Sequence, residues 1–268
     1  MSETGGQMRA VRRVFVVAAL SALVVALVPS AGAQTRTVTS VIGSADGLFV
    51  ELDLVVNDTE VGALQDISFG PEPTVTLPSE GGSVSEEVLD VDESAGPISL
   101  TAAVLRAAAE GALGPQGFAT AESTVTDLEL AEEELNGPVG VQQLTDPILA
   151  AELINADCAA DLTGVSGSTT LVGATVLGET LTAEPEPNTE LEVEIPGVAT
   201  VGVTLNRQVQ NPDGSLSVTA LVLEINVLDL VTGTLQVGPA TCGVVEGLEA
   251  APASAPAQAV PAQVRFTG

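Results

Sequence analysis

The clearest pattern of hydrophobic and polar positions lies in the back half of the chain. In residues 190–195, apolar side chains alternate with glutamates, and residues 201–205 alternate again between apolar and small polar side chains. A period of two is typical of a strand with one buried face. Between the two runs, Pro196-Gly197 suits the central positions of a type II turn, because proline presets φ and glycine accepts a positive φ. The pattern therefore predicts a β-hairpin here.

Short runs rich in Val, Thr, Leu and Ala continue along the chain, separated by Gly, Pro, Asn and Asp. This punctuation is typical of an antiparallel β-sandwich or a barrel-like sheet, and it predicts an all-β fold. The tight-turn sequence Asn211-Pro-Asp-Gly214 predicts a second hairpin. The predicted strands are residues 38–42, 48–56, 74–77, 84–91, 98–110, 119–130, 148–158, 169–177, 190–195, 201–207, 216–227 and 233–242.

Three segments also admit a helix. Residues 100–112 have the Ala-rich composition of a helix, and residues 148–160 follow Pro147, where a helix could begin. We predict strands for both, because their neighbours are β and tertiary context overrides propensity. The one short helix that we predict covers residues 128–135, with its acidic run in solvent.

The first 33 residues have the form of an export signal. A basic start with Arg12 and Arg13 precedes an apolar core at residues 14–28, and Ala31-Gly-Ala33 has the small-x-small form that signal peptidase cuts. The core is shorter than the roughly 20 residues that span a bilayer as a helix. We therefore predict cleavage after Ala33 and favour the general secretory route, with the twin-arginine route as the alternative.

Composition divides the chain into three regions. We predict a signal peptide at residues 1–33, a single β domain at 34–248 and a disordered tail at 249–268. The tail is rich in Ala and Pro and cannot bury enough apolar surface to fold, so we expect a flexible spacer. The predicted location is secreted or extracellular, with at most a loose association with the cell wall.

The net negative charge of the chain limits its possible binding partners. The formal net charge is −29, and loss of the signal, with three Arg and Glu3, takes it to −31. Such a surface repels phosphate backbones and anionic headgroups, so we expect no nucleic-acid partner and no stable membrane insertion after cleavage. The expected partner is a surface or matrix component whose identity the sequence does not show.

The chain has two cysteines, Cys158 and Cys242. Two cysteines in an exported chain predict one disulfide, because thiols oxidise outside the cell. In the chain-entropy model, closing the long segment between them stabilises the fold by roughly 4–5 kcal/mol. The alternative is a pair of free buried thiols.

Several short motifs of the mature chain resemble the choice-of-anchor P family of secreted actinobacterial proteins, over residues 36–247. The resemblance implies an extracellular or cell-surface module without an assigned biochemical role, and it supplies no catalytic residues. The chain departs from the family at Arg207, where the family carries an acidic residue, and in its tail, where no anchor is recognised. The motifs are Ser44-Ala-Asp-Gly-Leu48, Pro73-Thr-Val-Thr-Leu-Pro78 with Gly81-Gly82, Ala156-Asp-Cys158, Pro187-Asn-Thr189, Ile195-Pro-Gly197, Val203-Thr-Leu-Asn-Arg-Gln208, Ser217-Val-Thr-Ala-Leu221 and Val237-Gly-Pro-Ala-Thr-Cys242.

The residue types that the chain lacks exclude several enzyme mechanisms and one class of metal site. The chain has no His and no Lys, which excludes Ser-His-Asp and Cys-His mechanisms, His-ligated metals and Schiff-base lysines. It has no Trp or Tyr, and the β domain holds only Phe49, Phe69 and Phe118, so an aromatic stacking platform for sugars is poorly supplied. We predict no catalytic residue, no bound cofactor and no metal site.

Carboxylates leave two alternatives open. Asp90, Asp92 and Glu93, and the glutamates of residues 184–194, offer the hard oxygen ligands that calcium prefers, although no Asp-x-Asp-x-Asp-Gly loop is present. A glycosidase needs two suitably spaced carboxylates, and chance supplies many pairs here. Our first hypothesis is a non-enzymatic extracellular module; the second is a calcium-dependent binding domain, and the third is a carboxylate-based hydrolase.

The polar triplet Asn206-Arg207-Gln208 is unusual between apolar strand residues. We favour a structural role over ligand binding, since polar groups at strand ends usually satisfy backbone groups. Arg207 is predicted to pair with Glu224 across the second hairpin.

Overall fold

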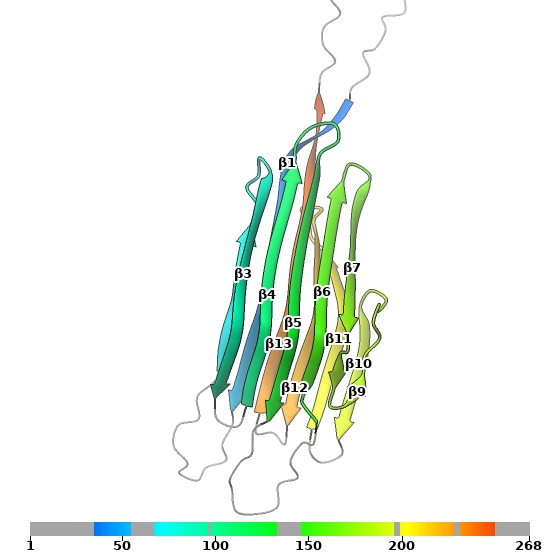
Figure 1. Cartoon of the computed structure of the whole chain (residues 1–268). Helices are drawn as coiled ribbons and strands as arrows, with labels where there is room; N and C mark the ends of the chain where they lie inside the picture. The colour runs from blue at the N-terminus through cyan, green and yellow to red at the C-terminus, as the bar shows by residue number, and fades with distance from the viewer. Residues whose placement is uncertain are drawn as a thin grey trace, which may run out of the picture. The chain divides into compact units, whose positions relative to one another are not determined.

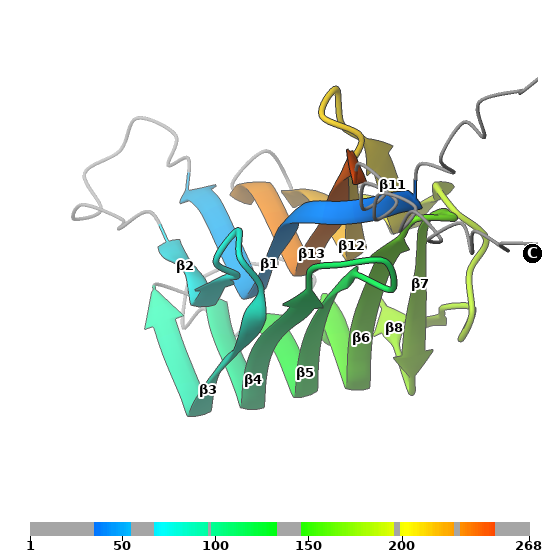
Figure 2. The ribbon, with the colours of Figure 1, turned by 90° about the horizontal axis from the view of Figure 1, so that it is seen from above.

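The computed structural model describes residues 35–54, 67–95, 98–132, 146–195, 199–227 and 231–249. All regular structure within these ranges is β-strand, and the strands form two antiparallel sheets that pack face to face (Figures 1 and 2). Each sheet is open, with an edge strand on either side. The predicted all-β sandwich is confirmed.

The first sheet is built from both ends of the domain, and the second from its middle. In spatial order, the first sheet contains β10 (Thr189–Ile195), β11 (Ala199–Gln210), β12 (Leu216–Val227), β13 (Val231–Glu249), β1 (Thr35–Leu54) and β2 (Ile67–Thr76). The second contains β3 (Gly82–Ala95), β4 (Ile98–Ala112), β5 (Phe118–Glu132), β6 (Leu149–Asp161), β8 (Thr175–Val176) and β9 (Glu179–Thr180), with β7 (Gly164–Val172) also paired to β6.

The first and last strands of the domain pair with each other inside the first sheet. β1 pairs with β13 from Thr35 opposite Glu249 to Leu54 opposite Val231, the longest pairing in the fold. The chain crosses to the second sheet between β2 and β3 and returns between β9 and β10. Because this central pairing joins residues far apart in sequence, it forms only when the two ends of the domain meet.

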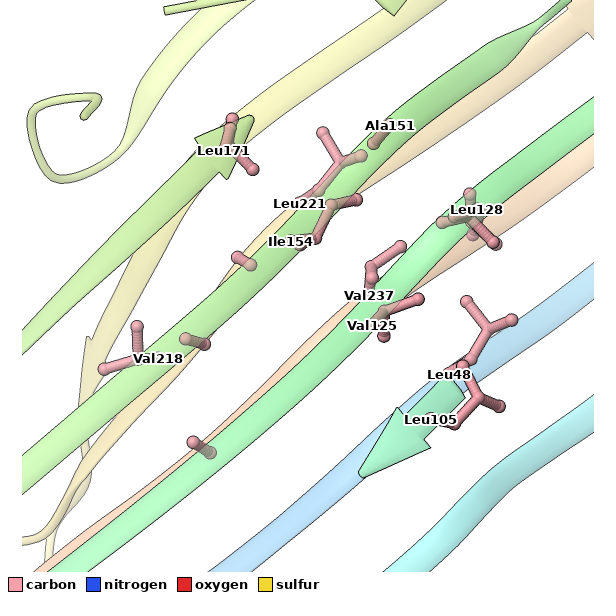
Figure 3. Packing of buried hydrophobic residues seen from close by; sticks show 14 of the residues in the cluster. Leu48, Leu105, Val125, Leu128, Ala151, Ile154, Leu171, Val218, Leu221 and Val237 are labelled. Atoms are coloured by element: carbon pink, nitrogen blue, oxygen red, sulfur yellow. The ribbon is translucent and has the colours of Figure 1, made fainter. Parts of the chain in front are cut away.

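The core consists of aliphatic side chains from both sheets. Alternate residues of each strand face inward, and the largest fully buried ones include Leu48, Leu105 and Leu128 (Figure 3). Many core positions of the second sheet are alanines, such as Ala107 and Ala121. Small inward side chains allow close contact between the layers, so the sandwich packs without a buried aromatic residue in the described ranges.

The predicted helix at residues 128–135 is wrong where the structure describes it. Leu128 to Glu132 end strand β5, and Leu128 and Leu130 are buried while Glu129 is exposed. β4 and β6 flank this stretch, so its backbone groups are taken up by sheet hydrogen bonds. Pairing on both sides outweighs the helical preference of Leu, Ala and Glu.

The two Ala-rich segments are strands, as predicted. Residues 100–112 lie in β4, and residues 148–160 lie mostly in β6. Two predicted boundaries differ: runs 38–42 and 48–56 belong to one long β1, and run 169–177 divides into β7 and β8 around Gly173, whose φ is 61°. No local pattern predicts β9, which has two residues.

Both predicted hairpins are confirmed. β10 pairs with β11, from Thr189 opposite Leu205 to Ile195 opposite Ala199, but the predicted Pro-Gly turn lies outside the described residues. β11 pairs with β12 around the turn at residues 211–214. There the Asn211 N–H donates to the Ser215 carbonyl at 2.8 Å, and Gly214 has φ 85°, which favours glycine.

The predicted signal peptide and its cleavage after Ala33 lie outside the described residues, as does the tail beyond Glu249. The described part of the chain holds no helix with the length and apolar character needed to cross a bilayer.

Candidate functional site

The predicted disulfide joins the two sheets. Cys158 of β6 is bonded to Cys242 of β13, with a sequence separation of 84 and a Cα–Cα distance of 5.7 Å. Both cysteines are buried. The bond therefore fixes the central strand of one sheet against a central strand of the other.

A shallow trough lies on the outer face of the second sheet, directly over β6. Two adjoining depressions of about 300 and 380 Å³ share Thr120, Ala159 and Ser166 on their walls and floor. We name this feature the β5–β7 trough. Its outward-facing residues are Phe118, Thr120 and Glu122 on β5, Asp157, Ala159 and Asp161 on β6, Gly164, Ser166 and Ser168 on β7, and Thr163 in the turn after β6.

Strand register arranges these residues in three rows across the trough. Phe118 pairs with Asp161 and Asp161 with Gly164, Thr120 with Ala159 and Ala159 with Ser166, and Glu122 with Asp157 and Asp157 with Ser168. Neighbouring inward residues such as Ala119 and Cys158 are buried, so the rows point outward. Small residues in the middle row give the trough its shallow floor.

Two carboxylates of like charge face each other in the trough. Glu122 is held by neighbours: its Oε1 accepts hydrogen bonds from Asn155 Nδ2 at 3.1 Å and from Thr124 Oγ1 at 3.3 Å. Asp157 accepts no hydrogen bond from the part of the chain that the structure describes. Loss of water around Asp157, and then the charge of Glu122, raise the pKa of the Asp157 carboxyl. Directly opposed like charges destabilise a sheet, and no basic residue lines the trough to offset the repulsion between these two carboxylates.

One end of the trough combines an aromatic ring with a hydrogen-bonded carboxylate. Phe118 is partly buried there, opposite Asp161. Asp161 Oδ1 accepts hydrogen bonds from the Thr163 N–H at 2.6 Å and the Thr163 hydroxyl at 2.5 Å, and these lower the pKa of Asp161. Asp161 therefore stays ionised and fixed in place.

A second acidic pair lies on the outer face of the other sheet. Glu192 and Glu224 sit opposite Gly202 from its two sides, in a depression of about 440 Å³ that Glu190 and Thr204 also line. Both glutamates are exposed. The depression exists because Gly202 has no side chain.

The residues singled out for calcium do not come together. Asp90, Asp92 and Glu93 lie on edge strand β3, where Asp90 has a positive φ of 53°. Glu190, Glu192 and Glu194 share one face of β10. Among the described residues, no group of three or more His, Cys, Asp or Glu side chains is placed to hold a metal ion.

The polar triplet of β11 is a structural junction. Buried Asn206 donates from Nδ2 to the Pro185 carbonyl at 2.9 Å and accepts from Thr169 and Gln208, and Gln208 also donates to the Gly167 carbonyl at 2.9 Å. These bonds connect β11 to β7 and to the segment before β10, which supports the structural role that we favoured.

The predicted pairing of Arg207 with Glu224 is wrong. Thr219 stands opposite Arg207, and Gly202 stands opposite Glu224, so the two side chains are separated by five positions along the strands. The turn at residues 211–214 fixes this register, and the prediction placed Glu224 too near the turn.

A buried serine links the sheets near the middle of the fold. The Ser123 hydroxyl donates to the Asp46 carbonyl at 2.6 Å, from β5 to β1. Burial raises the pKa of the half-buried Asp46 side chain, and a hydrogen bond from Thr74 partly opposes that change. No local pattern in the sequence predicts this contact or the trough. Glu122 and Asp157 lie in predicted strands, but nothing local shows that the two strands place them opposite each other.

The chain has no significant match among protein-family models, curated proteins or solved structures. The resemblance to the choice-of-anchor P family therefore stays a prediction.

Proposed function

We propose that the protein is a secreted, non-enzymatic extracellular or cell-surface module that binds a surface or matrix component through the β5–β7 trough. The observation that carries this proposal is the position of the disulfide. Cys158 lies in β6 between Asp157 and Ala159, so the cross-link fixes the strand at the centre of the trough. Sites built on rigid strands hold their side chains in a defined geometry without loop ordering.

The disulfide also supports the extracellular location. Structural disulfides form and persist in oxidising compartments and are rare in the cytosol. The signal-like residues 1–33 agree with export, and the acidic surface favours solubility.

The trough favours binding over hydrolysis. Glu122 and Asp157 project side by side from one sheet face. In the usual glycosidase arrangement, two carboxylates flank the scissile bond from different sides of the sugar. Two carboxylates beneath a bound chain cannot reach both sides of one bond.

A divalent-cation-dependent binding domain is the second candidate, and the paired carboxylates favour it. A calcium ion would offset the repulsion between Glu122 and Asp157. The pair would need further oxygen ligands from water or from the partner.

Co-sedimentation with intact producing cells tests the proposed function. We expect the mature, oxidised protein to sediment with the cells and the double variant Glu122→Gln/Asp157→Asn to remain in solution, with the matched variant Glu192→Gln/Glu224→Gln sedimenting like wild type. Equal sedimentation of all three proteins, or of none, would contradict binding through the trough.

Repeating the assay with a chelator, and with calcium at about 1 mM, separates the two candidates. Binding that needs calcium supports the second candidate. Binding unaffected by chelator supports the first.

A further inference from the structure

We propose that the ligand of the β5–β7 trough is an extended, uncharged glycan chain lying along β6. This inference rests on the proposed function and names the class of partner that the trough selects. It follows from the shape of the trough, its hydrogen-bonding groups, its single aromatic ring and its charge.

The shape suits an extended chain. The rows from Phe118 to Glu122 follow one another along the strands for about 13 Å, at about 3.3 Å per residue. Ala159 forms the floor of the middle row, with Gly164 at one end, so no large side chain divides the two depressions. A linear polymer can therefore lie along the strand direction and occupy both.

The hydrogen-bonding groups suit a polyol. Asp157 has acceptor oxygens without a donor among the described residues, and the described part of the chain likewise provides no partner for the hydroxyls of Ser166 and Ser168. A carboxylate accepts from two adjacent hydroxyl groups, and a serine hydroxyl both donates and accepts. Sugar hydroxyls supply donors and acceptors together, and hydrogen bonds to Asp157 would stabilise its ionised form beside Glu122.

Phe118 adds an apolar contact at one end. Its partly exposed ring is next to Thr120 and Asp161, in the first depression. The apolar face of a sugar ring can pack on an aromatic ring while its hydroxyls reach the polar neighbours. This arrangement differs from an aromatic platform, because Phe118 is the one aromatic residue in the lining, beside hydroxyl and carboxylate groups.

Charge decides which glycans are accepted. Glu122, Asp157 and Asp161 line the trough, and no basic residue does. Uronic acids and phosphate-bearing polymers would bring like charge onto these carboxylates, whereas a neutral chain meets no repulsion. The same charge would also admit a basic peptide, which the experiment separates.

Affinity electrophoresis of the full mature, disulfide-intact protein tests the proposal. The probes are soluble neutral polysaccharides (a β-glucan, a mannan and an arabinan), the anionic polysaccharide alginate, and poly-lysine. We expect at least one neutral polysaccharide to retard the protein, and alginate to have no effect. Asp157→Ala and Phe118→Ala should each weaken that retardation about tenfold, the size of one hydrogen bond to a charged group or one apolar contact.

Glu192→Ala is the matched control, because it removes an exposed carboxylate from the other sheet. Its retardation by the neutral polysaccharide should equal that of wild type, and thermal unfolding should show that every variant is folded. No retardation by any neutral polysaccharide, or equal weakening by Glu192→Ala, would overturn the proposal.

Two outcomes distinguish a wrong ligand class from a wrong function. Retardation by poly-lysine alone, reduced by Asp157→Ala but not by Glu192→Ala, would show that the trough takes a basic peptide. Trough-dependent sedimentation with cells, without binding to any neutral polysaccharide, would keep the proposed function and reject the glycan. Absence of both would reject the two together.

Discussion

At the scale of single residues, the fold contains one local conflict and one fully satisfied polar cluster. Asp157 faces Glu122 without a hydrogen-bond donor in the described residues, whereas Asn206 uses both its amide and its carbonyl group. The first arrangement costs stability and the second provides it. The two positions should therefore respond in opposite ways to loss of their polar groups.

Replacing Asp157 by Asn should stabilise the protein at neutral pH. The pKa of Asp157 is raised in the folded state, so the folded protein disfavours the ionised carboxylate. The stability that the protonated side chain allows is fully present below the ordinary pKa of 3.8, and it is lost as pH rises through the folded-state pKa. We expect Asp157→Asn to increase the free energy of unfolding by about 0.2–1 kcal/mol at pH 7, less in high salt, and by almost nothing near pH 3.

Urea unfolding at the two pH values measures this difference. Asp161→Asn is the control, because the pKa of Asp161 is lowered and its carboxylate adds stability above its ordinary pKa, which is lost as pH falls. A less stable Asp157→Asn protein at pH 7 would contradict the expected repulsion.

Replacing Asn206 by Ala should destabilise the protein by about 1–3 kcal/mol, because the Pro185 carbonyl loses its donor and Gln208 and Thr169 lose their acceptor. Asn206 also has φ 48°, so Asn206→Gly separates the backbone contribution from the side-chain contribution. Urea unfolding of both variants measures the two effects. If both variants unfold like wild type, the cluster has no structural role.

At the scale of elements, pairing decides what local sequence leaves open. Residues 100–112 and 128–132 have helical composition, yet both are strands with a neighbour on either side. Strand pairing also positions β7, which pairs with β6. At Gly167, β7 approaches β12 of the other sheet closely. At that position the sheets meet without room for a side chain.

Gly167→Ala should therefore destabilise the fold by about 1–3 kcal/mol, since the new Cβ would lie 2.3 Å from a methyl group of Val218. Gly202→Ala is the matched control within a strand, because its Cβ would have only ordinary contacts, the nearest at 3.6 Å from Glu224. The midpoints of urea unfolding should separate the two variants. Equal midpoints would mean that β7 can move away from β12 at no cost.

At the scale of the whole molecule, one covalent bond spans the two sheets and the first and last strands pair with each other. The chain between Cys158 and Cys242 includes β7 to β12, so the disulfide limits the unfolded chain over almost the whole back half of the domain. The core itself is aliphatic and rich in alanine. A core of small side chains buries less apolar area per residue, which increases the share of stability that the cross-link supplies.

Removing the disulfide by the double variant Cys158→Ala/Cys242→Ala should lower the free energy of unfolding by roughly 4–5 kcal/mol in the chain-entropy model. Denaturant unfolding of oxidised wild type and the variant measures the loss, and intact mass before and after reduction shows that wild type carries the bond. The same urea midpoint for both proteins would contradict the stabilising role.

The sequence alone determined which way side chains face along the two strands of the first predicted hairpin. Alternation in residues 190–195 and 201–205 predicted a hairpin that the structure contains, and two cysteines in a chain with a signal-like start predicted the disulfide. The hairpin follows from local alternation, and the disulfide follows from the number of cysteines in the chain. A period of two assigns each side chain to a face before any partner strand is known.

Only the tertiary structure decided which residues meet. In the structure, Glu122 pairs with Asp157, and Arg207 lies five positions from Glu224 along the paired strands. The predicted helix that begins at Leu128 is the end of strand β5 where the structure describes it. Sheet order and register depend on contacts between distant segments, and the alternation within each strand is compatible with many partners and many registers. The trough exists because three strands share one register, and no single strand carries that information.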